Sequence, residues 1–193
     1  MADIGFIVDS SGSLRRHYSK EKDFVKLVAN SLDISPKGSH VGVVLFSKIA
    51  ELSVKFSDHT NLKDFESAVD GLRMMGSITR IDKALTMAYD NMFNEKNGMR
   101  VKAPKILILL TDGAQTKAAD AIAPAQAVAR FHDAGVKVIV IGIGSGVKVD
   151  ELKMIVKSPD NLFLAANFDQ LKSETFVNSI IGSTCTQISG KLP

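Results

Sequence analysis

The chain has a single cysteine, no tryptophan and five prolines among its 193 residues. One cysteine cannot form an internal disulfide, so the fold must depend on its own hydrophobic core, which a chain of this length can bury. No apolar run approaches the roughly 20 residues that a membrane-spanning helix needs, and membrane insertion is therefore not expected. The sequence also has no Asn-x-Ser/Thr acceptor for glycosylation.

Charge is nearly balanced, with 24 basic against 21 acidic residues and a formal net charge of +3. No basic run is interleaved with aromatic residues, so a nucleic-acid partner is not expected. Hydrophobic residues make up 45% of the chain and charged residues 23%, which is typical of an ordinary globular domain.

Apolar runs alternate with segments of helical spacing along nearly the whole chain. Strands are expected over residues 3–8, 41–46, 49–56, 105–111, 136–143 and 162–164. Helices are expected over residues 18–33, 62–72 and 81–92, from Pro124 to before Gly135, around 152–156, and over 168–181.

This alternation predicts an α/β fold, because parallel strands need helical crossovers, and these are right-handed. Residues 41–46 and 49–56 are separated by Ser47-Lys48 alone, which permits only an antiparallel pair. We expect a doubly wound, Rossmann-like sheet of six strands. It is mostly parallel, has one antiparallel edge strand, and carries helices on both faces.

Oxygen-bearing side chains follow two of the buried strands. The run Asp9-Ser10-Ser11-Gly12-Ser13 follows the first strand, and Thr111-Asp112-Gly113 ends the strand over residues 105–111. The carboxyl ends of strands are the ligand-binding edge of an open α/β sheet. Two carboxylates with neighbouring hydroxyls suit a hard cation, Mg²⁺ first, with Mn²⁺ or Ca²⁺ as alternatives.

Thr79 could add a further hydroxyl at this edge. It stands just before the helix that contains Ala84 and Leu85. Threonine is also a common N-cap residue, so its position alone favours a capping role.

With these three elements in order, the chain resembles a von Willebrand factor type A domain. The match runs from Asp3 to Cys185, so the domain is expected over residues 3–185 with a tail over 186–193. The resemblance implies a complete metal-ion-dependent adhesion site. The short loop after Gly144 leaves no room for the extra helix of collagen-binding integrin domains. The strand Asp3–Val8, the run Gly135-Val136-Lys137-Val138 and the tail ending in Cys185 resemble the extracellular-matrix type, like matrilins and collagen VI. The implied metal ligands are Asp9, Ser11, Ser13, Thr79 and Asp112.

The resemblance also implies a non-enzymatic adhesion or matrix-assembly module. The cation would bridge to a Glu or Asp of an extracellular partner, such as collagen or another matrix protein. The expected location is extracellular, as one secreted domain of a larger protein. The alternative is an intracellular A-domain scaffold in a multiprotein complex, which a lone cysteine permits.

Basic residues flank all three elements and could form a rim that attracts acidic loops or sulfated glycans. The alternative is ordinary solvated surface charge. These residues are Arg15, Arg16 and His17 after the first element, Arg80 after Thr79, and Lys117 after the third.

Two further features have competing explanations. Cys185 is either a lone thiol or, as the resemblance implies, the partner of a cysteine upstream of Asp3. The run Gly142-x-Gly144-x-Gly146 mimics a dinucleotide-binding loop, but it follows a late strand, so a tight turn is expected there.

Overall fold

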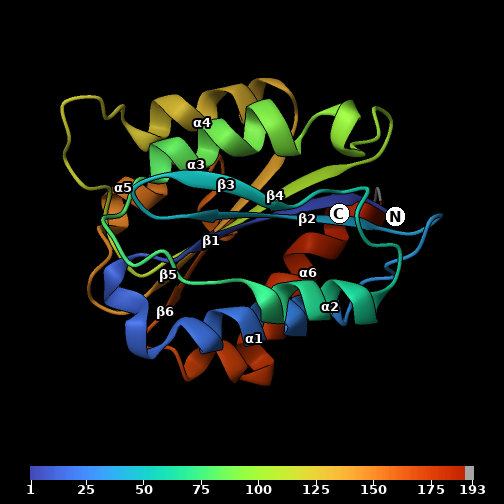
Figure 1. Ribbon diagram of the computed structural model, residues 1–193, viewed down its shortest axis with the longest axis horizontal. Coiled ribbons are helices and arrows are strands. Elements are labelled where there is room, and N and C mark those ends of the chain that lie inside the picture. The colour runs from blue at the N-terminus through green and yellow to red at the C-terminus, as the bar shows by residue number, and fades with distance from the viewer. Residues whose placement is uncertain (190–193) are drawn as a thin grey trace.

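The computed structural model describes the backbone of residues 1–189 and the side chains of residues 1–184. Its strands form one six-stranded sheet in the order β3-β2-β1-β4-β5-β6 (Figure 1). The strands are β1 (Asp3–Asp9), β2 (His40–Phe46), β3 (Ala50–Val54), β4 (Lys105–Thr111), β5 (Lys137–Ile143) and β6 (Leu162–Ala165).

The sheet has the topology that the sequence predicts. Every neighbouring pair of strands is parallel except β2 and β3, which run antiparallel at one edge. The chain places β2 on one side of β1 and β4 on the other, so the order reverses between β1 and β4. This reversal is the point at which open α/β sheets bind ligands, beyond the carboxyl ends of the strands.

Helices cover both faces of the sheet (Figure 1). One hydrophobic cluster joins the sheet to α1, α2 and α6, and a second joins it to α3, α4 and α5. The helices are α1 (Tyr18–Ala29), α2 (Leu62–Gly71), α3 (Ile81–Met87), α4 (Pro124–Asp133), α5 (Val149–Lys153) and α6 (Glu174–Ser189). The shorter turns are η1 (Gly12–Arg16), the π-helical η2 (Ala88–Met92), η3 (Glu95–Asn97), η4 (Pro159–Asn161) and η5 (Gln170–Lys172).

The central strands are buried on both faces, which explains their unbroken apolar sequences. In β1, Phe6 and Val8 pack toward the α1 side, whereas Ile7 packs toward the α3 side. All three side chains are fully buried. The strand therefore holds Asp9, its last residue, in a fixed position at the edge of the sheet.

The last helix begins later than the sequence predicts. Residues 170–172 form the 3₁₀ turn η5, and α6 starts at Glu174, so the expected helical start at Phe168 is wrong. Leu171 is nevertheless fully buried, and Phe168 stacks on His17 with ring centroids 4.5 Å apart. The apolar spacing therefore reflects packing of the connecting segment rather than a continuous helix.

No helix within residues 1–189 is both long enough and apolar enough to span a bilayer. Helix α6 continues to Ser189, through the first residues of the expected tail 186–193. The side chain of Cys185 lies outside the described residues, so its pairing remains a prediction.

Candidate metal site

Three loops meet at the carboxyl edge of β1 and β4. Gly12 N donates to Ser77 O at 2.7 Å, and Gly76 N donates to Ser10 O at 2.8 Å, which joins the loop after β1 to the loop before α3. Thr116 N donates to Thr79 O at 2.8 Å, which joins that second loop to the loop after β4. These backbone hydrogen bonds bring the three sequence elements to one place.

Asp9 forms the buried base of the site. Its side chain has no solvent exposure. Its Oδ1 accepts the backbone N–H of Ser11 at 2.8 Å, and its Oδ2 accepts the hydroxyl of Thr111 at 2.7 Å. Burial raises the pKa of Asp9 to about 6, although the hydrogen bonds from Ser11 and Thr111 act in the opposite direction. Nearby positive charge would favour its ionised form.

Two serine hydroxyls and Asp112 line the outer part of the site. Ser11 Oγ lies 3.2 Å from Ser13 Oγ, and Ser13 Oγ donates to Asp112 Oδ1 at 2.8 Å. Ser11 is buried, whereas Ser13 is exposed and Asp112 is half-buried. Burial also raises the pKa of Asp112. The candidate oxygens therefore range from the buried carboxylate of Asp9 to the solvent-exposed hydroxyl of Ser13.

Thr79 lies beside the third sequence element. A Cβ placed on Gly113 would be 3.4 Å from Thr79 Oγ1, so the threonine hydroxyl lies beside the residue that follows Asp112. The N-cap residue of α3 is Arg80, so the alternative role of Thr79 as the cap of this helix is not observed. Thr79 is 8% exposed.

Among the described residues, no three His, Cys, Asp or Glu side chains cluster closely enough to hold a metal ion. A cation at this edge would therefore depend on hydroxyl oxygens together with the carboxylates of Asp9 and Asp112. Such a mixed set of neutral and charged oxygens is suited to Mg²⁺, Mn²⁺ or Ca²⁺ and unsuited to soft metals.

The basic rim is smaller than the sequence predicts. Arg15, Arg16 and Lys117 are exposed, as a rim requires. Arg80, however, is 2% exposed and forms ion pairs of 2.7 Å with Asp82 and Asp120. Its charge is neutralised inside the protein, so its assignment to the rim is wrong.

Sequence reasoning also missed residues that shape the site. The Ser47 hydroxyl, directly after β2, accepts Ser77 N at 2.9 Å and donates to Ile78 O at 3.0 Å. Gly146 lies so near the third element that a Cβ would stand 2.5 Å from Asp112 O. Ser47 could have been identified from its position directly after a buried strand. Nothing in the local sequence indicates that Gly146 lies against Asp112.

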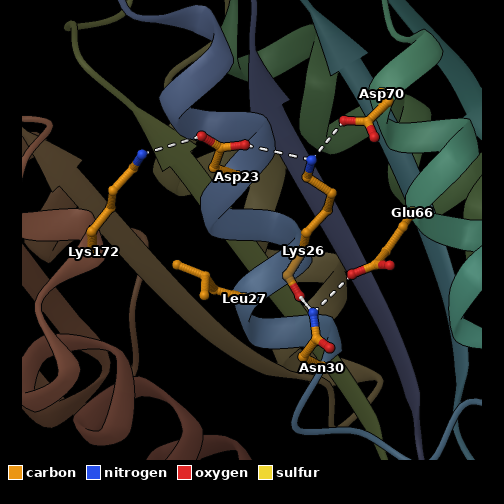
Figure 2. A pocket seen from close by; sticks show the side chains of 7 residues that line it. All are labelled: Asp23, Lys26, Leu27, Asn30, Glu66, Asp70 and Lys172. Atoms are coloured by element: carbon orange, nitrogen blue, oxygen red, sulfur yellow. Dashed lines mark hydrogen bonds and ion pairs between the residues drawn. The ribbon is translucent and has the colours of Figure 1, made fainter.

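A hollow of about 420 Å³ lies between α1, α2 and η5, away from these loops (Figure 2). Lys26 pairs with Asp70 at 2.7 Å and with Asp23 at 3.5 Å, while Lys172 pairs with Asp23 at 3.3 Å. Both lysines of the hollow are thus engaged in ion pairs, Glu66 accepts a hydrogen bond from Asn30, and none of the predicted metal ligands lines it. It is therefore a weaker candidate for a binding site than the sheet edge.

The chain is similar to proteins of the extracellular matrix. Matrilin-2 of Mus musculus is 32% identical over 182 residues, which cover 91% of this chain and 18% of that protein. The collagen alpha-1(XII) chain of Notophthalmus viridescens is 31% identical over 192 residues, which cover 98% of this chain and 20% of that protein. The chain thus spans about a fifth of the length of these two relatives.

Solved structures of proximal thread matrix protein 1 from the mussel byssus share the fold. One matches with a TM-score of 0.89 and 28% identity, and covers 96% of this chain and 48% of that chain. Another, whose metal-ion-dependent adhesion site is occupied by zinc, has a TM-score of 0.85 at 26% identity and covers 95% of this chain and 46% of that chain. Residues 3–177 match the family model of the von Willebrand factor type A domain. The chain therefore belongs to the von Willebrand factor type A domain family.

Proposed function

We propose that the domain binds a divalent cation through Asp9, Ser11, Ser13, Thr79 and Asp112. The supporting observation is the contact between the first and third loops, in which Ser13 Oγ lies 2.8 Å from Asp112 Oδ1 and 3.2 Å from Ser11 Oγ. An octahedron of oxygens with metal–oxygen distances of about 2.1 Å has edges of about 3 Å, close to both separations. The residues present therefore fit Mg²⁺ or Mn²⁺.

The proposed role of the ion is to bind an acidic side chain of another protein. Five protein ligands leave a position of an octahedral ion for water or for a partner's carboxylate. Asp9 and Asp112 balance the double positive charge of the ion, and the hydroxyls add no further charge. A Glu or Asp of collagen or another matrix protein would then complete the coordination, and no catalytic step is required.

The exposed cations Arg15, Arg16 and Lys117 support an anionic partner. They lie a few residues after Ser13 and Asp112 in the chain and would attract acidic loops or sulfated glycans, within a screening distance of about 10 Å at 0.1 M salt. The matrix relatives favour an extracellular location, as one domain of a larger secreted protein, over an intracellular scaffold.

The first test is the effect of metal on stability. A ligand that binds only the native state adds RT ln(1 + [L]/Kd), so Mg²⁺ at about 100 times its Kd should add roughly 2.7 kcal/mol to the free energy of unfolding. Thermal melts with Mg²⁺, Mn²⁺ and EDTA, together with calorimetric titration, measure this increment. Identical melting temperatures and no heat of binding would count against the site.

The second test concerns the partner. The domain should be captured by immobilised collagens or other matrix proteins in Mg²⁺ and released by EDTA. Immobilised heparin, a sulfated glycan, is a separate test. The domain would bind it through exposed arginine and lysine side chains, and this binding would not require metal. Capture that is equal in Mg²⁺ and EDTA would favour a scaffold whose binding does not involve the ion.

Gly146→Ala should weaken metal binding without direct contact to the ion. The added methyl group would lie 2.5 Å from Asp112 O, so the backbone that carries this ligand must move. We expect at least a tenfold increase in the Kd for Mn²⁺, measured by calorimetry, because misplaced support of a ligand typically costs 10- to 100-fold. Gly71→Ala, which has open space around the new methyl group, is the matched control and should leave the Kd unchanged.

A further inference from the structure

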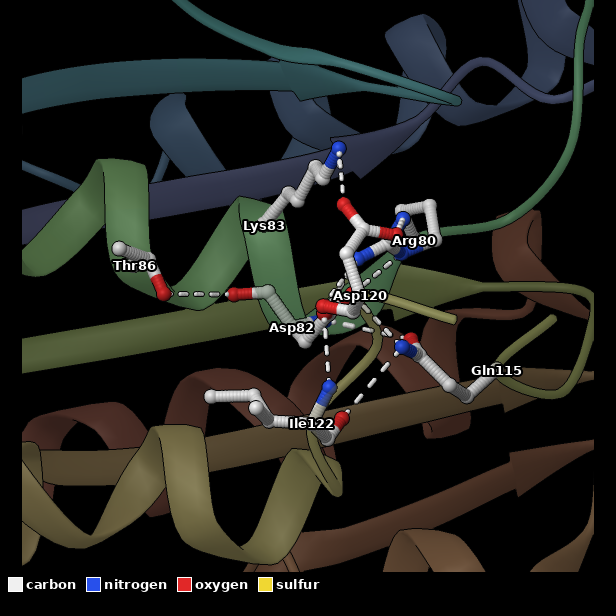
Figure 3. Close-up of polar contacts among 7 residues, drawn as sticks. All are labelled: Arg80, Asp82, Lys83, Thr86, Gln115, Asp120 and Ile122. Atoms are coloured by element: carbon white, nitrogen blue, oxygen red, sulfur yellow. Dashed lines mark hydrogen bonds and ion pairs between the residues drawn. The ribbon is translucent and has the colours of Figure 1, made fainter. Parts of the chain in front are cut away.

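Arg80 is the centre of a buried ionic network beside the proposed metal site (Figure 3). Its guanidinium donates to both carboxylate oxygens of Asp82, from Nε to Oδ1 at 2.9 Å and from Nη2 to Oδ2 at 2.7 Å. Nη1 donates to Asp120 Oδ1 at 2.7 Å, and Nη2 also reaches Asp120 O at 3.2 Å. This geometry uses the rigid, planar fork that distinguishes arginine from lysine.

Asp82 binds the long loop after β4 to the start of α3. Gln115 Nε2 donates to Asp82 Oδ1 at 2.6 Å, and its Oε1 accepts Asp82 N at 3.2 Å. Ile122 N donates to Asp82 Oδ2 at 3.2 Å. Burial alone would raise the pKa of Asp82, but the hydrogen bonds from Arg80 and Gln115 lower it to about 2, so the carboxylate is ionised.

The network adjoins one proposed metal ligand and is linked to the loop that carries another. Arg80 follows Thr79 in the chain, and its backbone N donates to Ser47 O at 3.0 Å. Thr79 N donates to Thr116 Oγ1 at 3.2 Å, and Thr116 N returns a hydrogen bond to Thr79 O. Thr116 in turn lies four residues after Asp112, in the loop that Asp82 and Arg80 hold.

We infer that Arg80 is a positioning residue, which, with Asp82, fixes the Thr79 loop against the Asp112 loop and so sets the geometry of the metal site. This role rests on the proposed function, since it concerns the same ion. Thr79 lies in the loop before α3, and Asp112 lies in the loop after β4. The pair of Arg80 and Asp82 joins these two loops through its hydrogen bonds to the second loop. Buried ionic groups add little net stability, but they can select one arrangement of the elements around them.

The test is the Mn²⁺ affinity of variants, measured by calorimetry, with melting temperatures recorded in EDTA. Arg80→Lys keeps the charge but loses the bidentate hydrogen bonding to Asp82. The Kd of this variant for Mn²⁺ should rise at least tenfold. The double variant Arg80→Leu with Asp82→Leu leaves no unpaired buried charge, so it should fold and show a similar rise. Asp120→Asn changes an exposed side chain and should give a smaller rise in a domain of unaltered stability.

Arg100→Lys is the matched control. Arg100 forms a comparable pair with the fully buried Asp3, at the opposite end of β1 from the metal site. It should lose stability in EDTA but keep the Mn²⁺ affinity of the unaltered chain. An unchanged Kd in both Arg80 variants, or an equal loss in Arg100→Lys, would overturn the inference. Failure of the unaltered chain to bind Mn²⁺ would instead overturn the metal site and, with it, this role.

Discussion

Asp112→Ala is expected to abolish the stabilisation of the domain by Mg²⁺. The substitution removes one of the two carboxylates among the proposed ligands, and Asp9 with the neutral hydroxyls cannot balance the charge of a divalent ion. At a metal concentration of about 100 times the Kd of the unaltered chain, the loss is roughly 2.7 kcal/mol in the free energy of unfolding. Capture by a metal-dependent matrix partner should disappear as well.

The same substitution should have little effect in EDTA, or a small effect of the opposite sign. The pKa of Asp9 is raised mainly by burial, but the nearby carboxylate of Asp112 also contributes. Removing Asp112 therefore lowers the cost of ionising Asp9, which offsets the lost hydrogen bond from the exposed Ser13. Thermal melts of both proteins in Mg²⁺ and in EDTA separate the two effects.

Ser10→Ala is the control for this experiment. Ser10 lies within the first element but is not a proposed ligand; it is fully buried and donates to Phe46 O at 2.8 Å. Its loss should cost about 1 kcal/mol in either condition and leave the increment from Mg²⁺ intact. A full Mg²⁺ increment in Asp112→Ala would place the ion elsewhere and contradict the proposed ligand set.

The parts of the fold that were predictable are those determined by local burial. The strand over residues 105–111 was expected and is observed with the same bounds, because a run of apolar residues covered on both faces ends at a polar residue. The start of the last helix was not predictable in this way. Phe168 and Leu171 have helical spacing, but the segment between them is a turn whose side chains pack on neighbouring elements.

The proposed ligands could be named from the sequence because they lie at the end of β1, in the turn that follows it, directly after β4 and just before α3. The pairing of Arg80 was not predictable in the same way, since one of its partners, Asp120, lies forty residues along the chain. Glu21 was also overlooked, because Lys20, Lys22 and Asp23 make its neighbourhood resemble solvent-exposed surface. Helical phase was the missed signal: Glu21 precedes the buried Phe24, Val25 and Val28 by three, four and seven residues.

Glu21 is a fully buried carboxyl group without a hydrogen-bond partner among the described residues. Neither Oε1 nor Oε2 has a protein donor within reach, and the hydroxyl of Tyr18, on the same helix, is unpartnered too. Burial raises the pKa of Glu21 well above its usual value, and the negative charges of Asp9 and Asp112 act in the same direction. In the absence of metal, the group therefore destabilises the native state when it ionises.

Glu21→Leu is consequently expected to stabilise the metal-free domain by about 1–3 kcal/mol at neutral pH, the typical cost of an unsatisfied buried polar group. Leucine also extends the apolar face that Phe24, Val25 and Val28 form. Glu21→Gln removes the charge but leaves a polar group unpaired, so its gain should be smaller. Glu95→Leu, at an exposed site, should stay within about 0.5 kcal/mol.

The pH dependence of this gain distinguishes a buried titrating group from better packing alone. In the unfolded chain Glu21 loses its proton near pH 4.5, whereas in the native state it retains the proton to a higher pH. Above about pH 4.5 the native state thus binds more protons, and its stability falls as pH rises. The advantage of Glu21→Leu, measured by melts in EDTA, should therefore grow from pH 4.5 to pH 8. A constant advantage between pH 4.5 and pH 8 would mean that Glu21 is already ionised in the native protein, through a partner that satisfies its charge, because only a carboxyl group whose native pKa is raised makes the difference depend on pH in this range.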